Sequence, residues 1–490
     1  MDTMNKYDRI ERYLRQAITA GVYQPEDKLP SIRQLSTDKN VSKNTVIRAY
    51  QELEAVGLIY SVAKSGYRVK AISRPDSKLN ASNHPPSKVD LLSICKSILT
   101  YSSEKERLPA GSAHPNIKFP AIKSLYAEIG RHSRIQSQLP SQYQIPPGNH
   151  LLIKQLLKIS HDLGITAHYG DIAVTHGAQQ GISLALRALT NKGDIVAVES
   201  PCFFGNLLLM ESLGLEVVEI PSCLATGINP EALDKAISQW DIKAIIVTPN
   251  FSNPTGSRMT LEKRQRLLAV SKSIPIIEDD VFGALSSDES LPSLKSLDTQ
   301  DRVIYINSLS KTLDSRLRIG WILSGRYQKQ IERLLISDNM GSLNLMQSAV
   351  AEFLTTGKYR SHINKMKRVY LSNGKKLHQW LTEALNQYPS LQGRYHLTKA
   401  SGSFITWLTL PEHIDSHQLY LECKKEKIGI YPGVAFGTNN KFGHCLRLTY
   451  ANLEGTTSEK QGVERLARLI DQHCQREEKS YVQRASALTD

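Results

Sequence analysis

The stretch from residue 303 to residue 318 combines a buried strand with residues that could do chemistry. Residues 303–307 are almost all apolar, and Ser308, Ser310 and Lys311 follow them directly. Burying an ammonium group is costly, so a lysine just beyond such a strand needs a reason. Pyridoxal phosphate (PLP) offers one, because it forms a Schiff base with a lysine amine, and Ser308, Ser310 and Arg318 could hold its phosphate. The alternative is a strand-end lysine that reaches water.

The strands expected around this stretch are short and apolar. They are residues 195–199, 244–248, 275–279, 303–307 and 319–322. Near-continuous apolar strands are typical of a mostly parallel α/β sheet with helices on both faces. Ligands in such sheets bind beyond the carboxyl ends of the strands. We therefore look for further chemistry at these ends.

Three loops fit parts of a planar, phosphorylated ligand. Residues 175–181 are rich in glycine and lead into a helix, whose free N–H groups and dipole favour a phosphate. Phe203 could lie flat on a ring, with a core phenylalanine as the alternative. Asn253 precedes Pro254, which holds it out of helix. Its amide could meet a ligand oxygen, or it could be an ordinary turn asparagine.

Two charged residues in apolar strands complete this set. Asp279 ends one strand, and a carboxylate there is costly unless it meets a cation such as a protonated pyridine nitrogen. Arg447 stands alone in the apolar run 445–450. It suits a ligand carboxylate, or it forms a structural ion pair. Each signal is weak alone, but together they fit one ligand.

Residues 1–72 predict a small basic DNA-binding module. Apolar residues at helical spacing indicate a first helix, and Ser31 and Ser42 can cap two further short helices. Two short helices with a tight turn describe a helix-turn-helix, and residues 57–60 and 66–69 form a hairpin wing behind it. The segment has 12 Lys/Arg and 8 Asp/Glu, a net charge of 12 − 8 = +4. A merely solvated helix face is the alternative for its cations.

Composition bounds the rest of the chain. Residues 73–88 have little apolar content and predict a flexible linker. Residues 89–475 form the large domain, and residues 476–490 form a polar tail. The net charge of +14 favours a nucleic-acid partner without establishing one. The scattered cysteines indicate a cytoplasmic protein without a metal site, and no apolar run approaches the roughly 20 residues of a membrane span.

The segment from Tyr7 to Ile72 resembles the winged-helix domain of the GntR family of bacterial regulators. The matching motifs are Leu29-Pro30-Ser31-x-Arg33, Val41-Ser42-Lys43-x-Thr45-Val46 and Leu53-x-x-x-Gly57-Leu58-Ile59. The resemblance implies that the residues facing DNA are Arg33, Lys43, Asn44, Thr45, Lys64, Ser65 and Gly66. Arg48 lies one turn later on the same outward helix face and is predicted to face DNA with them. The family usually has arginine at position 43, and lysine keeps the charge but loses the bidentate grip.

Residues 91–472 resemble the fold-type I aminotransferases of class I/II. The most specific matches are Asn253-Pro254-Thr255-Gly256 and Ser308-x-Ser310-Lys311 with Arg318. The resemblance implies that Lys311 is the Schiff-base lysine and that the phosphate is held by Ala178, Gln179, Ser308, Ser310 and Arg318. It also implies that the ring and the ligand carboxylate are held by Phe203 (stacking), Asp279 (ring nitrogen), Asn253 (ring oxygen) and Arg447 (carboxylate).

Two further residues bear on how such a site works. Tyr143 resembles the tyrosine that reaches the phosphate of the partner subunit, which implies a dimer with sites at the interface. The family commonly has a tyrosine shortly after the aspartate, and Val281-Phe282 stands there instead. The missing hydroxyl should raise the pKa of the Schiff base and weaken the polarisation of the ring. An absorbance titration with an ordinary aminotransferase pKa would count against this hypothesis.

A GntR-type winged helix joined to an aminotransferase-like domain resembles the MocR subfamily of bacterial transcription regulators. The resemblance implies a PLP-binding homodimer, arranged head to tail, that binds a double-stranded DNA operator. Its effector is PLP itself, a small amine or an amino acid. The alternative is an active aminotransferase with an appended DNA-binding domain, although the missing tyrosine leans against efficient turnover. A third hypothesis, a dimerisation scaffold without cofactor, is disfavoured because the whole cofactor set is present.

Overall fold

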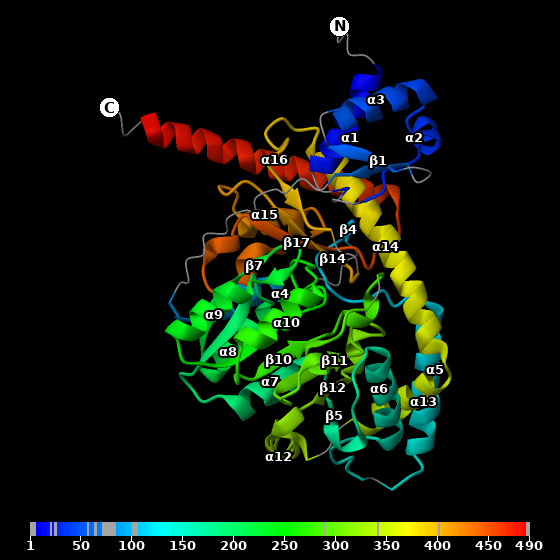
Figure 1. The fold of residues 1–490 in the computed structure, drawn as a ribbon. Coiled ribbons are helices and arrows are strands. Elements are labelled where there is room, and N and C mark those ends of the chain that lie inside the picture. The colour runs from blue at the N-terminus through cyan, green and yellow to red at the C-terminus, as the bar shows by residue number, and fades with distance from the viewer. Residues whose placement is uncertain are drawn as a thin grey trace.

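The chain forms a small N-terminal module beside a large α/β domain (Figure 1). This computed structural model describes residues 6–19, 22–23, 27–55, 58–62, 66–70, 85–99, 106–140, 142–288, 290–340, 343–399 and 402–486 of the 490-residue chain. Among the described residues, no helix is long and apolar enough to cross a membrane.

The N-terminal module is a winged helix-turn-helix, as predicted. Its elements are α1 (Lys6–Thr19), α2 (Ile32–Asp38), α3 (Lys43–Ala55), β1 (Ile59–Val62) and β2 (Gly66–Val69). Leu14, Val46 and Leu53 are fully buried where the helices meet. The strands pair antiparallel with Ile59 opposite Val69, and a bridge between Lys28 and Arg68 adds the segment before α2 to the wing.

Both predicted helix caps of this module are confirmed. The Ser31 hydroxyl accepts a hydrogen bond from the Gln34 N–H at 3.1 Å. The Ser42 hydroxyl accepts one from the Thr45 N–H at 3.2 Å. Each hydroxyl satisfies one N–H group that the first helical turn leaves without a partner. The start of α3, which carries Lys43 and Asn44, is therefore fixed by a side chain from the turn itself.

The large domain is built on a nine-stranded mixed sheet with the order β3-β7-β6-β9-β10-β11-β12-β5, in which β8 also pairs with β7. The strands are β3 (Ser87–Lys88), β5 (Ile172–Thr175), β6 (Ile195–Ser200), β7 (Glu216–Cys223), β8 (Gly227–Ile228), β9 (Ile242–Val247), β10 (Ile276–Asp279), β11 (Val303–Ser308) and β12 (Gly320–Leu323). The central strands β7, β6, β9, β10 and β11 are parallel, as predicted. The strands β3, β8, β12 and β5 pair antiparallel.

Helices cover both faces of this sheet because alternate strand residues are apolar on both sides. In β6, Val196 and Val198 pack in one buried cluster, and Ala197 packs in another. The first cluster is covered by α7 (Ala178–Leu189), α8 (Phe204–Leu213) and α12 (Gln328–Asn339), and the second by α9 (Pro230–Gln239) and α10 (Leu261–Val270). The other helices are α4 (Leu92–Leu99), α5 (Pro120–Gln136), α6 (His150–Asp162), α11 (Leu294–Leu297) and α13 (Asn344–Thr355).

A second, antiparallel sheet in the C-terminal part positions Arg447. Its order is β13 (His396–Leu397), β14 (Ile405–Thr409), β17 (Cys445–Thr449) and β16 (Tyr431–Pro432). The register sets Arg447 of β17 between Trp407 of β14 and Tyr431 of β16. The helices α14 (Lys358–Leu385), α15 (Ser416–Lys425) and α16 (Thr457–Ser486) complete this part, and β4 (Leu108–Pro109) pairs with β15 (Ile428–Gly429).

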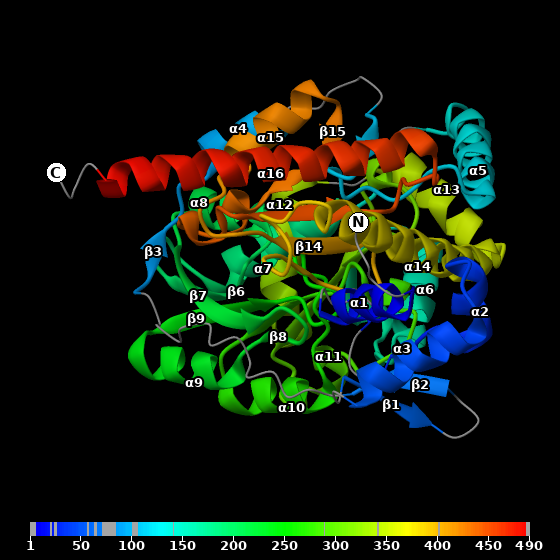
Figure 2. The same cartoon turned by 90° about the horizontal axis from the view of Figure 1, so that it is seen from above.

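Two segments differ from the sequence-based expectation. Ser87 and Lys88, expected at the end of the linker, form β3 and pair with Val217 and Glu216. The C-terminal helix α16 continues to Ser486, although a polar tail was expected from residue 476. Figure 2 shows α16 running across the large domain toward the C-terminus. Short polar segments carry no periodic signal strong enough to reveal either element.

The N-terminal module contacts the large domain where α14 ends. Both views show α14 approaching α1 (Figures 1 and 2). Asp27 of the module forms an ion pair with Lys399, which follows β13. The negative charge of Glu383 in α14 also acts on Tyr13 of α1 and contributes to raising its pKa, after desolvation by burial. The N-terminal module is therefore placed against α14 and the segment that follows β13.

Candidate functional site

Lys311 lies just beyond the carboxyl end of β11, the last of the parallel strands, which neighbours β10 on one side and β12 on the other. Its side chain is half-buried, and Nζ donates a hydrogen bond to the Ala113 carbonyl at 2.8 Å. Desolvation lowers the pKa of the Lys311 ammonium to about 8, and the positive charges of Arg447 and Arg318 act in the same direction, whereas Asp279 opposes them. With a pKa of about 8, roughly one Lys311 amine in ten is uncharged and nucleophilic at pH 7, far more than for an ordinary lysine.

This shift predicts how the reaction of the cofactor-free protein with PLP depends on pH. Only the uncharged amine attacks a carbonyl, so the rate should rise with pH and reach half its maximum near pH 8, not near the ordinary lysine value of 10.5. The rate is measured from the growth of the visible absorbance of the adduct. In Arg447→Gln, loss of a neighbouring positive charge should move the midpoint upward. A wild-type midpoint near 10.5 would contradict the prediction.

Asp279 ends β10 beside this lysine and is buried, with 7% of its surface exposed. The hydrogen bond that its carboxylate accepts from the Val281 N–H is long, at 3.4 Å. Burial raises the pKa of the Asp279 carboxyl to about 7. Among the described residues, no basic side chain forms an ion pair with it. Its neighbour Asp280 is satisfied, because the Asn250 amide and the Tyr305 hydroxyl donate to it at 2.7 and 2.8 Å.

A cradle of donors lies at the start of α7. Gly177 precedes this helix with φ +80°, and the first N–H groups of a helix have no intrahelical acceptor. Arg318 adopts the left-handed conformation with φ +51°, and its Nη2 donates to the His176 carbonyl at 2.9 Å. Ser308 and Ser310 lie behind, with their hydroxyl oxygens 2.9 Å apart. Hydroxyls, a guanidinium and a helix N-terminus form a suitable anion site.

Glycines let these segments approach one another. A Cβ at Gly320 would lie 2.6 Å from the Gly177 carbonyl carbon and 2.9 Å from the Ala178 nitrogen, and one at Gly177 would lie 2.6 Å from Arg318 Nη2. The strand β12 and the start of α7 can therefore pack this closely only without side chains.

Gly320→Ala is accordingly expected to displace the start of α7. The overpacking should cost about 1–3 kcal/mol of stability. PLP affinity should fall on the order of ten-fold, because the donors that are predicted to hold the phosphate move with the loop. Thermal unfolding and PLP titration measure the two effects. Gly170→Ala is a matched control, since nothing lies within 4 Å of its added Cβ. Equal PLP affinity in both variants would contradict the prediction.

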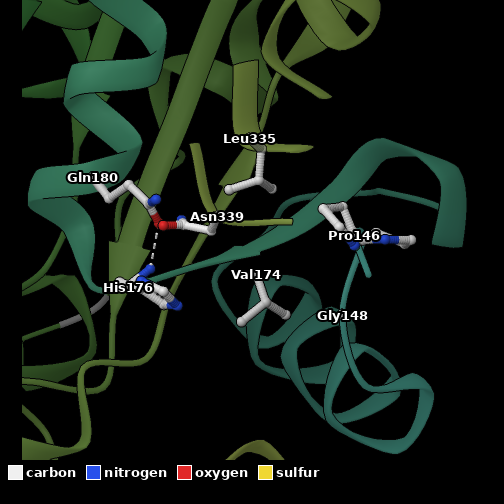
Figure 3. Close-up of a pocket in the computed structure, with 8 residues that line it drawn as sticks. Pro146, Gly148, Val174, His176, Gln180, Leu335 and Asn339 are labelled. Atoms are coloured by element: carbon white, nitrogen blue, oxygen red, sulfur yellow. Dashed lines mark hydrogen bonds between the residues drawn. The ribbon is translucent and has the colours of Figure 1, made fainter. Parts of the chain in front are cut away.

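Gln179 and Phe203 lie at the edge of the same cradle. The Gln179 side-chain amide donates one of its N–H groups to the Gly205 carbonyl at 2.7 Å, and its backbone N–H lies in the first turn of α7, where it has no intrahelical acceptor. The Phe203 ring is half-buried and packs on the backbone of Gly205. Figure 3 shows a pocket beside the start of α7, where His176 and Gln180 face Val174 and Pro146. That pocket does not include Lys311.

Arg447 is a buried cation without an acidic partner. Only 2% of it is exposed, and burial lowers the pKa of its guanidinium to about 10. Nη2 donates to the Gly111 carbonyl at 2.6 Å, and the guanidinium lies 4.5 Å from the Tyr431 ring centroid. Asn253 Oδ1 lies 3.4 Å from Nη1. Within the described part of the chain, Nε has no hydrogen-bond partner and no carboxylate forms an ion pair with Arg447.

The segment 111–114 closes the site from the other side. Its four consecutive carbonyls accept hydrogen bonds from side chains of Arg447, Thr449, Lys311 and Asn452, in that order. Sequence reasoning missed this segment, whose contacts lie 198 to 338 positions away. The run of small residues between Pro109 and Pro115 was the available signal.

The structure brings together most of the predicted cofactor residues and leaves one apart. Lys311, Asp279 and Arg447 converge, with Arg318 close enough for its charge to act on Lys311. Tyr143 instead is 80% exposed on the loop before α6.

The predicted DNA-facing residues lie mostly on the surface of the N-terminal module. Arg33, Lys43 and Asn44 are exposed at the starts of α2 and α3. The Arg48 guanidinium lies over the Tyr7 ring, 4.0 Å from its centroid. The Thr45 hydroxyl lies 2.8 Å from the Ser42 hydroxyl, as part of the cap. Gly66 begins β2, and Lys64 and Ser65 lie outside the described residues.

Comparison with known proteins agrees with both parts of the architecture. The family described as "Aminotransferase class I and II" matches residues 120–466, and "Bacterial regulatory proteins, gntR family" matches residues 6–69. Two relatives from Escherichia coli (strain K12) are described as uncharacterized HTH-type transcriptional regulators. YjiR is 32% identical, covering 91% of this chain and 95% of YjiR. YdcR is 31% identical, covering 96% of this chain and 100% of YdcR.

The large domain also matches solved structures. The crystal structure of Pyrococcus horikoshii kynurenine aminotransferase in complex with PMP superposes with a TM-score of 0.68 at 26% identity, covering 78% of this chain and 93% of that one. YjiR and YdcR match this chain across both the DNA-binding module and the large domain. The chain therefore belongs to the MocR-type transcription regulators, in which a GntR-family DNA-binding domain is joined to an aminotransferase class I and II domain.

Proposed function

We propose that this regulator binds PLP at Lys311 and senses PLP itself, an amine or an amino acid there, and that the ligand changes its affinity for a DNA operator. The main support is a pair of buried charges. Asp279 and Arg447 have no oppositely charged partner in ion-pair contact within the described residues, and both act on the amine of Lys311. Unpaired buried charges are costly, so such a set favours a ligand that supplies the missing partners.

The donor set fits PLP group by group. A protonated pyridine nitrogen would supply the cation that Asp279 lacks. The start of α7 with Ala178 and Gln179, together with Ser308, Ser310 and Arg318, would hold the phosphate. Phe203 would face the ring and Asn253 its oxygen. When bound, PLP supplies a carbonyl that captures amines and a ring that accepts electrons.

The chain's own residues would then select and orient the effector. Arg447 would bind a carboxylate in place of the Gly111 carbonyl and the Asn253 amide, which it contacts now. Phe282, fully buried against Phe404, offers no hydroxyl to the ring oxygen. Its ring centroid lies 5.8 Å from Lys311 Nζ. A site that captures amines but polarises the ring weakly suits sensing better than turnover.

A head-to-tail homodimer is part of the proposal. Tyr143, Leu139 and Ile145 are 80%, 60% and 59% exposed on the segment that joins α5 to α6, and Met340 is 65% exposed after α12. The pocket of Figure 3 brings the two segments together, because Pro146 and Asn339 both line it. An exposed apolar surface of this kind favours a protein interface. A second copy would cover it, and two DNA-binding modules would supply two half-sites.

A short route connects the site to the DNA-binding module. The Thr398 hydroxyl donates to the Thr255 carbonyl at 2.7 Å, two residues from Asn253. The next residue, Lys399, forms the ion pair with Asp27. A ligand that moves this segment would change how the module is held, and coupling needs such a difference between two states. As a bacterial DNA-binding regulator, the protein would act in the cytoplasm.

An active aminotransferase with an appended DNA-binding domain is the second candidate, favoured by the presence of Lys311, Asp279 and Arg447 together. The two are separated by a panel of amines and amino acids added to the PLP-loaded protein, with cofactor absorbance and keto-acid production recorded in parallel. For a sensor, we expect spectral changes with selected amines and little turnover with an added keto-acid acceptor. Sustained turnover with no effect of the same amines on DNA binding would contradict the sensing role.

A further inference from the structure

His114 lies at the mouth of the site, outside the set of residues that would hold PLP. It ends the segment 111–114, directly after Ala113, whose carbonyl accepts the hydrogen bond from Lys311. Its own carbonyl accepts from the Asn452 amide at 3.3 Å. The imidazole is exposed, and its Nδ1 lies 2.8 Å from the Ser315 hydroxyl. Its backbone is therefore held on the wall of the site while its ring remains accessible.

The hydrogen bonds of Ser315 fix which ring nitrogen carries the proton. The Ser315 hydroxyl donates its single proton to the Ser310 carbonyl at 3.1 Å. Both contacts of Ser315 are hydrogen bonds only when its oxygen accepts from Nδ1, so we assign the hydrogen of His114 to Nδ1. The other nitrogen, Nε2, then presents a lone pair that no described residue engages. The imidazole offers an acceptor to whatever enters the site.

The surrounding charges keep this acceptor neutral. Desolvation, together with the positive charges of Lys311 and Arg447, lowers the pKa of His114 to about 4, and Asp314 opposes them. The ring therefore adds no third positive charge beside these two cations. A neutral acceptor favours a donor on the ligand and disfavours a second carboxylate there, because two acceptors repel.

We propose that His114 belongs to the effector site and that its Nε2 accepts a hydrogen bond from an amino or hydroxyl group that the ligand carries beside its carboxylate. This inference rests on the proposed function, since it takes Arg447 as the carboxylate partner and Lys311 as the reactive amine. It narrows the effector to carboxylates with a nearby hydrogen-bond donor. Simple carboxylates and dicarboxylates lacking such a donor fit less well. His114 is thus a specificity residue, not a member of the PLP cradle.

The test compares L-lactate with propanoate, which differ only in the hydroxyl and cannot react with PLP. Each is titrated into the full-length, PLP-loaded protein, and the cofactor absorbance is recorded. In the wild type, lactate should bind about two- to ten-fold more tightly, as expected for one hydrogen bond. In His114→Leu the two affinities should become equal. In His114→Gln, whose amide oxygen can accept, the preference should return.

Each outcome has a defined meaning, because a merely structural histidine would change both affinities together and leave their ratio intact. An unchanged ratio in His114→Leu overturns the inference and leaves the proposed function standing. No response to either probe or to any amino acid overturns both. In the cofactor-free protein, the NMR titration of His114 should move to higher pH in Lys311→Ala, because a positive charge is removed. No movement would show that the ring does not face Lys311, and would overturn the inference independently of any ligand.

Discussion

Lys311→Ala should abolish the covalent attachment of PLP and the visible absorbance band that reports it. No other described lysine combines a place at the carboxyl end of the parallel strands with a pKa lowered by burial, Arg447 and Arg318. The measurement is the absorbance spectrum of the purified protein with PLP, followed by borohydride reduction and peptide mapping. The mapped PLP adduct should lie on the peptide that contains Lys311.

Two further variants distinguish loss of the covalent bond from loss of a positive charge or of folding as the cause of a missing absorbance band. Lys311→Arg keeps a positive charge but cannot form the Schiff base, so it should also lack the band. Lys263→Ala is the control. The Lys263 Nζ donates to the hydroxyl of Thr226, which lies in the turn between β7 and β8, at 2.7 Å. The absorbance band should remain in this variant. A band that survives in both Lys311 variants would place the reactive amine elsewhere. A wild-type protein that never develops the band would leave the large domain as a scaffold.

The second large effect concerns the DNA-binding module. Arg33→Ala with Lys43→Ala should weaken operator binding about 100-fold, since each substitution removes one cation that is predicted to face DNA and the effects of separate sites add. Fluorescence anisotropy with a labelled duplex, selected from a random pool by the full-length protein, measures the affinity. The measurement is repeated over a range of salt concentrations, and the logarithm of the affinity is plotted against the logarithm of the salt concentration. The slope of this plot should be smaller in magnitude by about 0.9 for each phosphate that the variant no longer neutralises.

Arg12→Ala serves as the control because it removes one positive charge from the same module, in α1. It should weaken binding only slightly and leave the salt slope nearly unchanged. The loss of operator affinity in Arg48→Ala should lie between those of Arg12→Ala and of the double variant, because the Arg48 guanidinium already lies over the Tyr7 ring. If Arg12→Ala weakened binding as much, per charge removed, as the Arg33→Ala/Lys43→Ala variant, net charge and not the helix starts would govern binding.

The sequence predicted the parts of the site that follow from strand order. In parallel strands the carboxyl ends meet at one edge, so Asp279 at the end of β10 and Lys311 after β11 had to lie close together. Helix caps were equally predictable, since Ser31 and Ser42 act within three residues of their own positions. Local signals of this kind survive folding because their partners are fixed by the chain itself.

The rest depended on contacts between distant segments. The carbonyls of residues 111–114 accept hydrogen bonds from side chains such as Lys311 and Arg447, and the run of small residues there does not tell which distant side chains these are. The side-chain amide of Gln179 bonds to the Gly205 carbonyl, 26 positions away, and the expected place of Gln179 at the phosphate remains a prediction. Tyr143 is exposed here and its expected role needs a partner subunit, so it remains a prediction. Tertiary partners decided each of these cases.

The central claim is that the occupied site changes DNA binding, and operator affinity as a function of cofactor state tests it most directly. The selected duplex is titrated with the cofactor-free protein, the PLP-loaded protein and the PLP-loaded protein with each amine that altered its spectrum. We predict that affinity differs between at least two of these states by about five-fold or more, and that Lys311→Ala shows no such difference. Equal operator affinity in all three wild-type states, with PLP demonstrably bound, would contradict the claim.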